Sequence, residues 1–596
     1  MTFRKLLAGV AAAATLLSGM AFGAGSAMAD EVEPATITLN GETGGAVKGH
    51  TYKAVRIGSY DHASFVQKDG VTYVESLTVN TEAAVATGAA AALNAAVAKG
   101  TDWNTGDYKD NPVGYVASKS DYFTSSPDKP WSGNLRNFVS LLVRQADFKT
   151  ALATVTAYTA DSDTLTISGL KEGLYVVVDT TVSNAENVDH KQTDSIPMLV
   201  GTKVNDKDFE GQTLGVVNVK NQTTYINKVI VKNNQEWVGT TERVGDTVTF
   251  KLTSQVPLTV GYLNTPEKPY HFSIGDTMSK GLTFQEVTSV TIGNKKLTEA
   301  ADGATATADQ YQLTTTANQK YDTTDTESKA TSLKFDLSNA VYAAGQNAAD
   351  SKATAKAEDT ITVVYTAKLN KDAVHAVKGA NPNKVTLDYT HNPDDNTEHH
   401  VPGPEVKVYT YDFGFLKVKA DGQTSLDGAK FVIKQDDQYF RFNTTTGLWE
   451  NGTKGAEPED ADKFIGTNGV FEFKGLAEGT YVVVETDAPA GYLSTTKAKF
   501  QVVITSTHKD KKGNVLGTEH EIKFVNGNTG FNLLTNLNAD GTAAEGGAKV
   551  KNLKSITQLP LTGAAGIAIF GVMAALVIGA GLAVGMKRRG IASRLA

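Results

Sequence analysis

The sequence predicts a mainly β fold built from tandem β-sandwich domains. Segments such as "TYVVVETDAPAGY", "HEIKFVNG" and "NKVTLDYTHNP" alternate apolar and polar residues and lie between turns rich in Gly, Asn, Asp and Pro. A period of two between such turns is typical of strands that place one face in a sandwich core. The 596 residues include no cysteine, so these domains must be stabilised without disulfides.

The N-terminal residues 1–29 predict a signal peptide. Arg4 and Lys5 precede a short apolar segment, which leads to the small-residue sequence Ala27-Met28-Ala29. Basic residues, an apolar core and an A-x-A site in this order are typical of secretory signals. We therefore expect cleavage between Ala29 and Asp30 and a secreted mature chain.

The C-terminal residues 559–596 predict a sorting signal with a membrane-inserted segment. Residues 564–586 contain no charged residue, and as a helix they would extend roughly 35 Å at about 1.5 Å per residue, enough to cross a bilayer. Lys587, Arg588 and Arg589 follow, which favours a cytoplasmic C-terminus. The pentapeptide "LPLTG" (559–563) would therefore lie at the outer membrane surface.

Between these ends the turn pattern predicts three domains, at 30–222, 223–408 and 409–530. Helical periodicity at 83–99 and 134–155 predicts helical insertions in the N-terminal domain. The Thr-, Ala- and Asp-rich segment 296–330 is expected to be a surface loop. Residues 531–558, rich in Asn, Gly and Ala, predict a flexible spacer before the sorting signal.

Polar residues extend the apolar faces of three strands in the third domain. The three faces are Phe413, Phe415 and Lys417; Tyr481, Val483 and Glu485; and Ile522, Phe524 and Asn526. Burial lowers the pKa of an amine and raises the pKa of a carboxyl group. A neutral Lys417 could then attack the carboxamide of Asn526, while a protonated Glu485 assists the loss of ammonia. The pattern predicts an intramolecular isopeptide bond.

Residues 413–526 resemble a CnaB-type domain of Gram-positive surface proteins, through "LKV", "LDGAKFVI", "GLAEGTYVVVETDAPAGY" and "FVN". With its signal peptide and LPLTG tail, the whole chain resembles a sortase-assembled major pilin, the backbone subunit of a fimbrium, of actinobacterial type. The resemblance implies tandem Ig-like or CnaB-type sandwiches, a cell-wall location, and a structural role that supports adhesion. It implies no enzymatic activity beyond autocatalytic bond formation.

The middle domain repeats the pattern with Lys228, Asp276 and Asn383, and the resemblance implies a Lys–Asn bond with an aspartate promoter. Counting residues along the strand favours Asn383 over Asn392, without deciding between them. In the first domain, Asp179 in "GLYVVVDTT" stands where the promoter would be. The expected first strand "ATITLNG" has no lysine, so no bond is expected there.

The resemblance implies that sortase cleaves between Thr562 and Gly563 of the motif Leu559, Pro560, Leu561, Thr562 and Gly563, and transfers Thr562 to an amine. A lysine of an identical subunit would extend a fibre, and peptidoglycan would anchor it. Major pilins carry this lysine near the end of the first domain, where "GVVNVKNQT" makes Lys220 the candidate. The Tyr-Pro that precedes it in the family is missing. Further implied partners are minor pilins and a host glycan or matrix ligand.

The alternative function is a wall-anchored monomeric adhesin, or a minor or tip pilin. Dispersed basic residues argue against nucleic-acid binding. The chain has no zinc-protease, nucleophile-elbow, P-loop or EF-hand motif, so we expect no catalytic residues and no cofactor. The segment "HNPDDNTEHH" (391–400) is interpreted as a polar loop, and no metal site is predicted.

Overall fold

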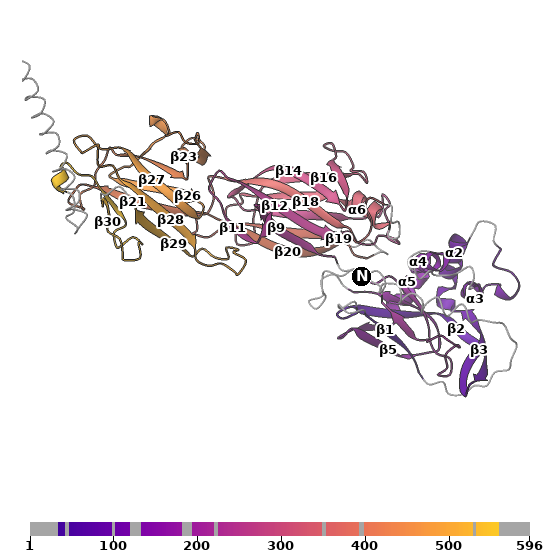
Figure 1. Ribbon diagram of the computed structural model, residues 1–596. Coiled ribbons are helices and arrows are strands. Elements are labelled where there is room, and N and C mark those ends of the chain that lie inside the picture. The colour runs from indigo at the N-terminus through magenta and orange to yellow at the C-terminus, as the bar shows by residue number, and fades with distance from the viewer. Residues whose placement is uncertain are drawn as a thin grey trace, which may run out of the picture.

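The structure is a computed structural model that describes residues 34–41, 47–97, 102–119, 133–181, 194–219, 224–347, 353–392, 398–527 and 532–558. Strands dominate these ranges, which confirms the mainly β fold. Three β-rich bodies follow one another along the chain (Figure 1). The cleavage site at Ala29 and Asp30, Lys220, LPLTG and the segment 564–586 lie outside the described residues. No helix within the described ranges is both long and apolar enough to cross a membrane.

The first body contains two sheets. One has the order β5-β1-β8, in which β1 pairs antiparallel with β5 and parallel with β8. The other has the order β3-β2-β6-β7, with β4 paired to β2. The strands are β1 (Ala35–Asn40), β2 (Thr51–Lys68), β3 (Val71–Thr81), β4 (Ala157–Thr159), β5 (Thr164–Leu170), β6 (Gly173–Asp179), β7 (Met198–Gly201) and β8 (Val216–Asn218). One apolar core contains Ile37, Tyr52 and Val177 and so joins the two sheets.

Short helices form a second core against the second sheet. They are η1 (Ala83–Val85), α2 (Ala86–Ala96), η2 (Gly106–Tyr108), α3 (Pro112–Ser118), α4 (Asn134–Leu142) and α5 (Ala146–Thr154). Leu135, Phe138 and Leu142 are buried in this core. The expected helix over 134–155 is two helices, because Gln145 adopts an extended backbone as the N-cap of α5. The sequence pattern did not predict α3, which begins at Pro112 and is capped by the Asn111 side chain.

The middle body is a sandwich with a continuous strand order, β10-β9-β12-β18-β14-β15-β16-β17-β13-β19-β20-β11. Its elements are β9 (Ile226–Lys232), β10 (Gln235–Trp237), β11 (Gly239–Thr241), β12 (Thr247–Gln255), β13 (Phe272–Met278), β14 (Leu282–Ile292), β15 (Lys295–Glu299), β16 (Gln310–Gln319), β17 (Ala330–Asp336), α6 (Ser338–Gly345), β18 (Thr360–Leu369), β19 (Asn381–Thr390) and β20 (Glu398–Tyr409). The prediction of a surface loop over 296–330 is wrong, because β16 lies within this segment and pairs with β17.

The third body has two sheets of order β26-β21-β31-β30 and β24-β23-β22-β27-β28-β29, with β25 paired to β22. Its strands are β21 (Tyr411–Val418), β22 (Lys430–Gln435), β23 (Gln438–Asn443), β24 (Leu448–Asn451), β25 (Phe464–Ile465), β26 (Val470–Leu476), β27 (Gly479–Asp487), β28 (Lys499–Ser506), β29 (His520–Asn526), β30 (Leu534–Thr535) and β31 (Lys549–Lys551). Short 3-10 turns lie at η3 (Asp460–Asp462) and η4 (Ile556–Gln558).

The predicted spacer over 531–558 is wrong for most of its length. Strand β31 pairs parallel with β21, the first strand of the third body, and β30 pairs with β31. Leu534, Val550 and Leu553 are buried. These few apolar residues lie among Gly, Ala and Asn, so the composition resembles a linker although the segment completes a sheet. The third domain therefore extends well beyond residue 530.

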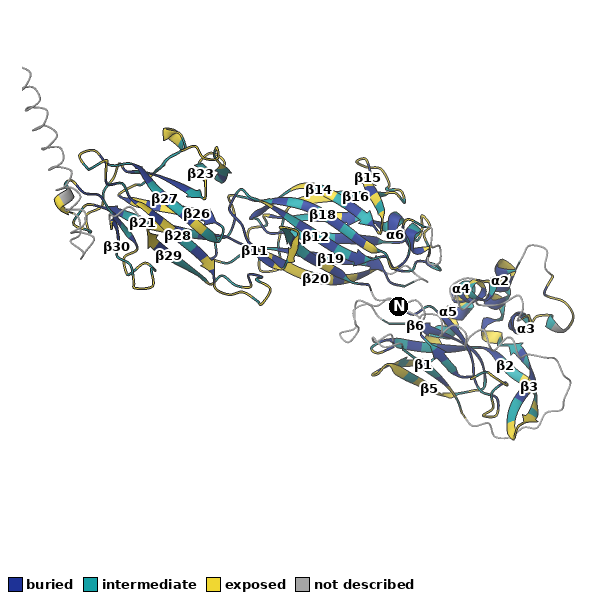
Figure 2. Cartoon of the chain, in the orientation of Figure 1, coloured by how far each residue is buried: buried dark blue, intermediate teal, exposed yellow. Residues whose placement is uncertain are grey.

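The middle and third bodies share one continuous apolar core. The backbone N–H of Val515 donates to the Gly239 carbonyl at 3.0 Å, so the chain of one body hydrogen-bonds to the other. The Arg243 guanidinium lies 4.2 Å from the centre of the Phe440 ring. Buried and exposed residues alternate along strands of both sandwiches (Figure 2). This alternation places selected polar side chains inside each core.

Candidate functional sites

The middle body contains a buried cluster of Lys228, Asp276 and Asn383. Lys228 lies on β9, Asp276 on β13 and Asn383 on β19, and none of the three is more than 2% exposed. Strands β13 and β19 are paired neighbours, whereas β9 reaches the cluster from the opposite layer. The Lys228 Nζ donates to Asp276 Oδ2. The fold thus brings together the three residues that the sequence pattern selected in this domain, while Asn392 lies beyond the end of β19 and is half-buried.

Tyr365 on β18 is a fourth member of this cluster. Its hydroxyl accepts from Lys228 Nζ at 3.2 Å and from Asn383 Nδ2 at 2.7 Å, and it donates to Asp276 Oδ1 at 2.7 Å. The hydroxyl therefore holds the amine, the acid and the carboxamide around one point. The sequence did not single out Tyr365, because its position in the alternating strand "TITVVYTAKL" is that of an ordinary core aromatic residue.

Burial shifts the pKa of the amine and the pKa of the acid in this cluster in opposite directions. Desolvation lowers the pKa of Lys228 to about 8, although the charge of Asp276 opposes the shift. Desolvation also raises the pKa of Asp276, against the opposing influence of Lys228. Both shifts favour the neutral amine and the protonated acid. Asn383 Oδ1 is buried and has no hydrogen-bond partner among the described residues.

The third body contains a buried pair of Lys417 on β21 and Glu485 on β27. Lys417 Nζ lies 3.3 Å from Glu485 Oε2, and both residues are at most 1% exposed. The backbone N–H of Ala498 also donates to Glu485 Oε2, at 2.9 Å. Desolvation lowers the pKa of Lys417 to about 8, with the charge of Glu485 opposing the shift. Burial therefore lowers the pKa of this amine as it lowers that of Lys228.

Asn526, the expected partner of Lys417, is not on a buried surface. It lies two residues after Phe524 and so belongs to the same face of the strand, but it is the last residue of β29 and is exposed. Strand β29 pairs with β28 in the other sheet, whereas the strand beside Lys417 is β31. The expectation that Asn526 is buried is therefore wrong, because the last strand to join the sheet of Lys417 is β31 rather than β29.

Asn552 occupies the place that was expected for Asn526. It is fully buried directly after β31, and its backbone N–H donates to the Val418 carbonyl at 3.1 Å. Lys417 Nζ donates to the carbonyl of the preceding residue, Lys551, at 3.2 Å. Neither side-chain polar atom of Asn552 has a hydrogen-bond partner among the described residues. A signal was present, since Asn552 extends the face of Ala548 and Val550 by a period of two.

In the first body, Asp179 is buried at the end of β6. Its Oδ2 lies 2.8 Å from His50 Nδ1 and also accepts from the backbone N–H of Ser195 at 2.8 Å. Asp179, which stands where the promoter acid would be, therefore pairs with His50 rather than with a lysine. Strand β1 has no lysine.

Comparison with known families matches two segments of the chain. The model named SpaA, described as a prealbumin-like fold domain, matches residues 411–519, and the LPXTG cell wall anchor motif matches residues 554–589. The first match begins at β21, where the third body begins. The chain thus carries a prealbumin-like domain and a cell wall anchor motif. Comparison with curated proteins gives no match.

Comparison with solved structures gives several similar chains. The T6 backbone pilin of serotype M6 Streptococcus pyogenes is 16% identical, with a TM-score of 0.45, over 89% of this chain and 100% of that chain. The full-length major pilin SpaD from Corynebacterium diphtheriae is 16% identical, with a TM-score of 0.45, over 89% and 99%. The 35 kDa C-terminal fragment of the major pilin GBS80 of Streptococcus agalactiae is 22% identical, with a TM-score of 0.36, over 56% and 100%.

Proposed function

We propose that the chain is the shaft subunit of a covalently polymerised cell-surface pilus. Sortase would join Thr562 of one copy to Lys220 of the next, and peptidoglycan and minor pilins would complete the fibre. The observation that supports this role best is the pair of buried Lys–acid–Asn clusters, one in each of two consecutive domains. A chain with a cell wall anchor motif and such clusters is built to resist pulling rather than to catalyse a reaction on a substrate.

We propose that each cluster forms an isopeptide bond, Lys228–Asn383 and Lys417–Asn552. The neutral Nζ attacks the side-chain carbonyl carbon of asparagine, and the neighbouring acid, Asp276 or Glu485, acts as the proton donor to the carbonyl oxygen and the proton acceptor from Nζ. The intermediate then loses the amide nitrogen as ammonia, which leaves a secondary amide and a regenerated acid. By the chain-entropy model, each closed loop would add about 5 kcal/mol of stability.

The places of these bonds fit tension along a fibre. Tension applied between Lys220 and Thr562 would enter the middle domain just before Lys228. It would leave the third domain just after Asn552. Both bonds would carry the tension from one strand directly to another, so most of each sandwich would bear no load. The first domain precedes Lys220 and so lies outside this path, which agrees with its lack of a lysine opposite Asp179.

Intact-mass measurement tests both bonds. The wild-type chain should be lighter than its sequence by about 34 Da, which is two molecules of ammonia. Asn552→Ala and Asn383→Ala should each remove one of the two ammonia losses. Asn526→Ala, at an exposed asparagine of the same domain, is the matched control and should keep both. Loss of a bond in the Asn526 variant, or a full mass in the wild type, would contradict the assignment.

Immunoblots of cell-wall extracts test polymerisation. Wild-type cells should show a ladder of high-mass species, and Lys220→Ala should reduce it to a single band. Lys203→Ala is the control, because Lys203 is a partly exposed lysine in the same domain that pairs with Asp208 at 3.2 Å. A single band in the wild type would instead support the alternative, a wall-anchored monomeric adhesin. If the ladder persists in Lys220→Ala, another lysine accepts Thr562 during polymerisation.

A further inference from the structure

A second buried cluster lies where the first and middle bodies meet. His50 and Asp179 come from the first body, at the start of β2 and the end of β6. Asp194 precedes β7 of the same body, and His391 directly follows β19 of the middle body. His391 and Asp194 are only 4% and 5% exposed. Four side chains with metal-binding atoms are thus excluded from water at a junction between domains.

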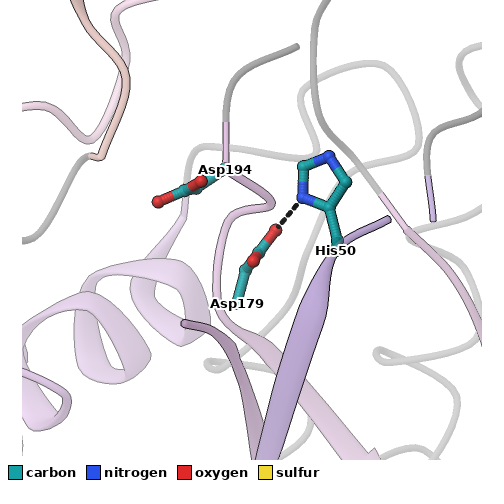
Figure 3. Close-up of side chains that lie close together, drawn as sticks. All are labelled: His50, Asp179 and Asp194. Carbon is teal, nitrogen blue, oxygen red and sulfur yellow. Dashed lines mark hydrogen bonds and ion pairs between the residues drawn. The ribbon is translucent and has the colours of Figure 1, made fainter. Parts of the chain in front are cut away.

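Figure 3 shows three side chains of this cluster close together, His50, Asp179 and Asp194. One donor atom from each of His50, Asp179 and Asp194 can be chosen so that all three lie within 4.8 Å of one another. His391 Nδ1 lies 3.2 Å from Asp194 Oδ1, which brings a fourth donor to the group. The backbone N–H of Asp194 also donates to the His391 carbonyl at 3.2 Å. The two bodies therefore meet at these residues by both backbone and side chain.

The hydrogen bonds within the described residues satisfy the Asp179 carboxylate but leave atoms of Asp194 and His391 without a partner. Asp194 Oδ2 and His391 Nε2 are both buried without a hydrogen-bond partner there. Burying such atoms without a partner is costly. Asp194 and His391 thus each have a buried atom that is available to bind a ligand.

We propose that His50, Asp179, Asp194 and His391 bind one divalent transition-metal ion, of the zinc type, that fastens the first domain to the middle domain. Two imidazoles and two carboxylates are a donor set that suits Zn²⁺ and Co²⁺, whereas Ca²⁺ and Mg²⁺ prefer oxygen atoms alone. The ion would neutralise both carboxylates and leave the imidazoles neutral. This inference goes beyond the proposed polymerisation and does not depend on it.

Zinc binding at this site would require the donor atoms to move closer together. Neighbouring donors of a tetrahedral zinc site stand about 3.4 Å apart, somewhat closer than the 4.8 Å limit that contains the three donors of the first body. Binding would draw Asp194 and His391 inward and would replace the contact between His50 and Asp179. Because three donors belong to the first domain and one to the middle domain, occupancy would restrict movement between them.

Zinc binding to the full chain, purified in detergent and stripped with a chelator, tests the proposal. Titration calorimetry and elemental analysis should give about one zinc ion per chain with a Kd of about 1 μM or tighter. Asp194→Asn and His391→Gln should each weaken binding by about 100-fold or more, since even outer partners of metal ligands are worth 10- to 100-fold. Ca²⁺ should not compete.

His400→Gln is the matched control, because His400 also pairs with an aspartate, Asp388, at 2.6 Å, but its side chain is 60% exposed. It should bind zinc as the wild type does. Equal zinc retention by wild type, Asp194→Asn and His391→Gln, or none in the wild type, would overturn the proposal. The Co²⁺ form of the wild type needs no variant: intense visible bands of a four-coordinate ion support the site, and the weak bands of hydrated Co²⁺ overturn it.

Discussion

At the scale of single residues, two lysines differ from the others in their burial. Lys228 and Lys417 are both fully buried next to an acid, and burial lowers the pKa of each to about 8. Most other lysines of the described residues lie at least partly in solvent, including Lys203 and Lys509. Burial rather than residue type therefore separates the two lysines proposed to form bonds from the rest.

Tyr365 offers a test of positioning in the middle cluster. Tyr365→Phe removes the hydroxyl that holds Lys228, Asp276 and Asn383 together, at a cost of about 1–2 kcal/mol in positioning. We expect the Lys228–Asn383 bond to form about tenfold more slowly, measured as the fraction of chains that keep the ammonia during a refolding time course. The third-domain bond in the same chain should form at its normal rate.

Tyr270→Phe is the matched control for this prediction. Tyr270 is a buried tyrosine of the same domain, and its hydroxyl has no hydrogen-bond partner within the described ranges. Its variant should form the bond at the wild-type rate. Equal slowing by both variants would mean that the effect comes from general destabilisation, and no slowing in Tyr365→Phe would remove the positioning role.

At the scale of elements, β31 is the strand that completes the third domain. It lies parallel to β21, so that Lys417 is opposite Val550 and Asn552 follows at the end of the pair. The two residues proposed to react are separated by most of the domain in sequence and meet only when β31 docks. Bond formation should therefore require the docking of this short strand.

Val550→Asp tests this dependence. Val550 is fully buried, and placing a carboxylate there costs about 3 kcal/mol or more. We expect the third-domain bond to be absent by intact mass and the thermal midpoint to fall. Val525→Asp on β29, where Val525 is 45% exposed, should leave both unchanged. Normal bond formation in Val550→Asp would show that β31 is not needed.

At the scale of the whole molecule, the two junctions between domains differ. The middle and third bodies share an apolar core, which includes Tyr411 and Val515. The first and middle bodies meet instead at polar groups, such as Asp194 with His391 and the Arg144 guanidinium, which donates to the Gly261 carbonyl at 2.8 Å. The proposed metal ion would therefore act at the polar junction, where no shared apolar core is found among the described residues.

Single-molecule pulling between Lys220 and Thr562 tests how the chain carries tension. With both proposed bonds intact, the middle and third domains should not unfold within the force range that opens ordinary sandwiches. In Asn552→Ala, the segment 418–551 becomes free to extend by roughly 45 nm at about 3.4 Å per residue. Asn526→Ala should behave as wild type. Extension of the third domain in the wild type would contradict the proposed bond.

The sequence by itself determined the β fold and the buried faces that contain Lys228, Lys417, Asp276 and Glu485. Each of these follows from a period of two within one strand, which is a local property. It also indicated the anchor motif at the C-terminus, which the family comparison matches. The same parity rule placed Asn383 correctly on a buried face of β19.

Only the tertiary structure decided which strand closes the third domain. Parity along β29 cannot reveal that Asn526 lies at an exposed strand end, and a Gly- and Ala-rich segment does not reveal that β31 completes a sheet. Likewise, nothing local connects His50 with His391. Such partners depend on contacts between segments far apart in the chain, and those contacts are fixed by the packing of whole sheets and domains.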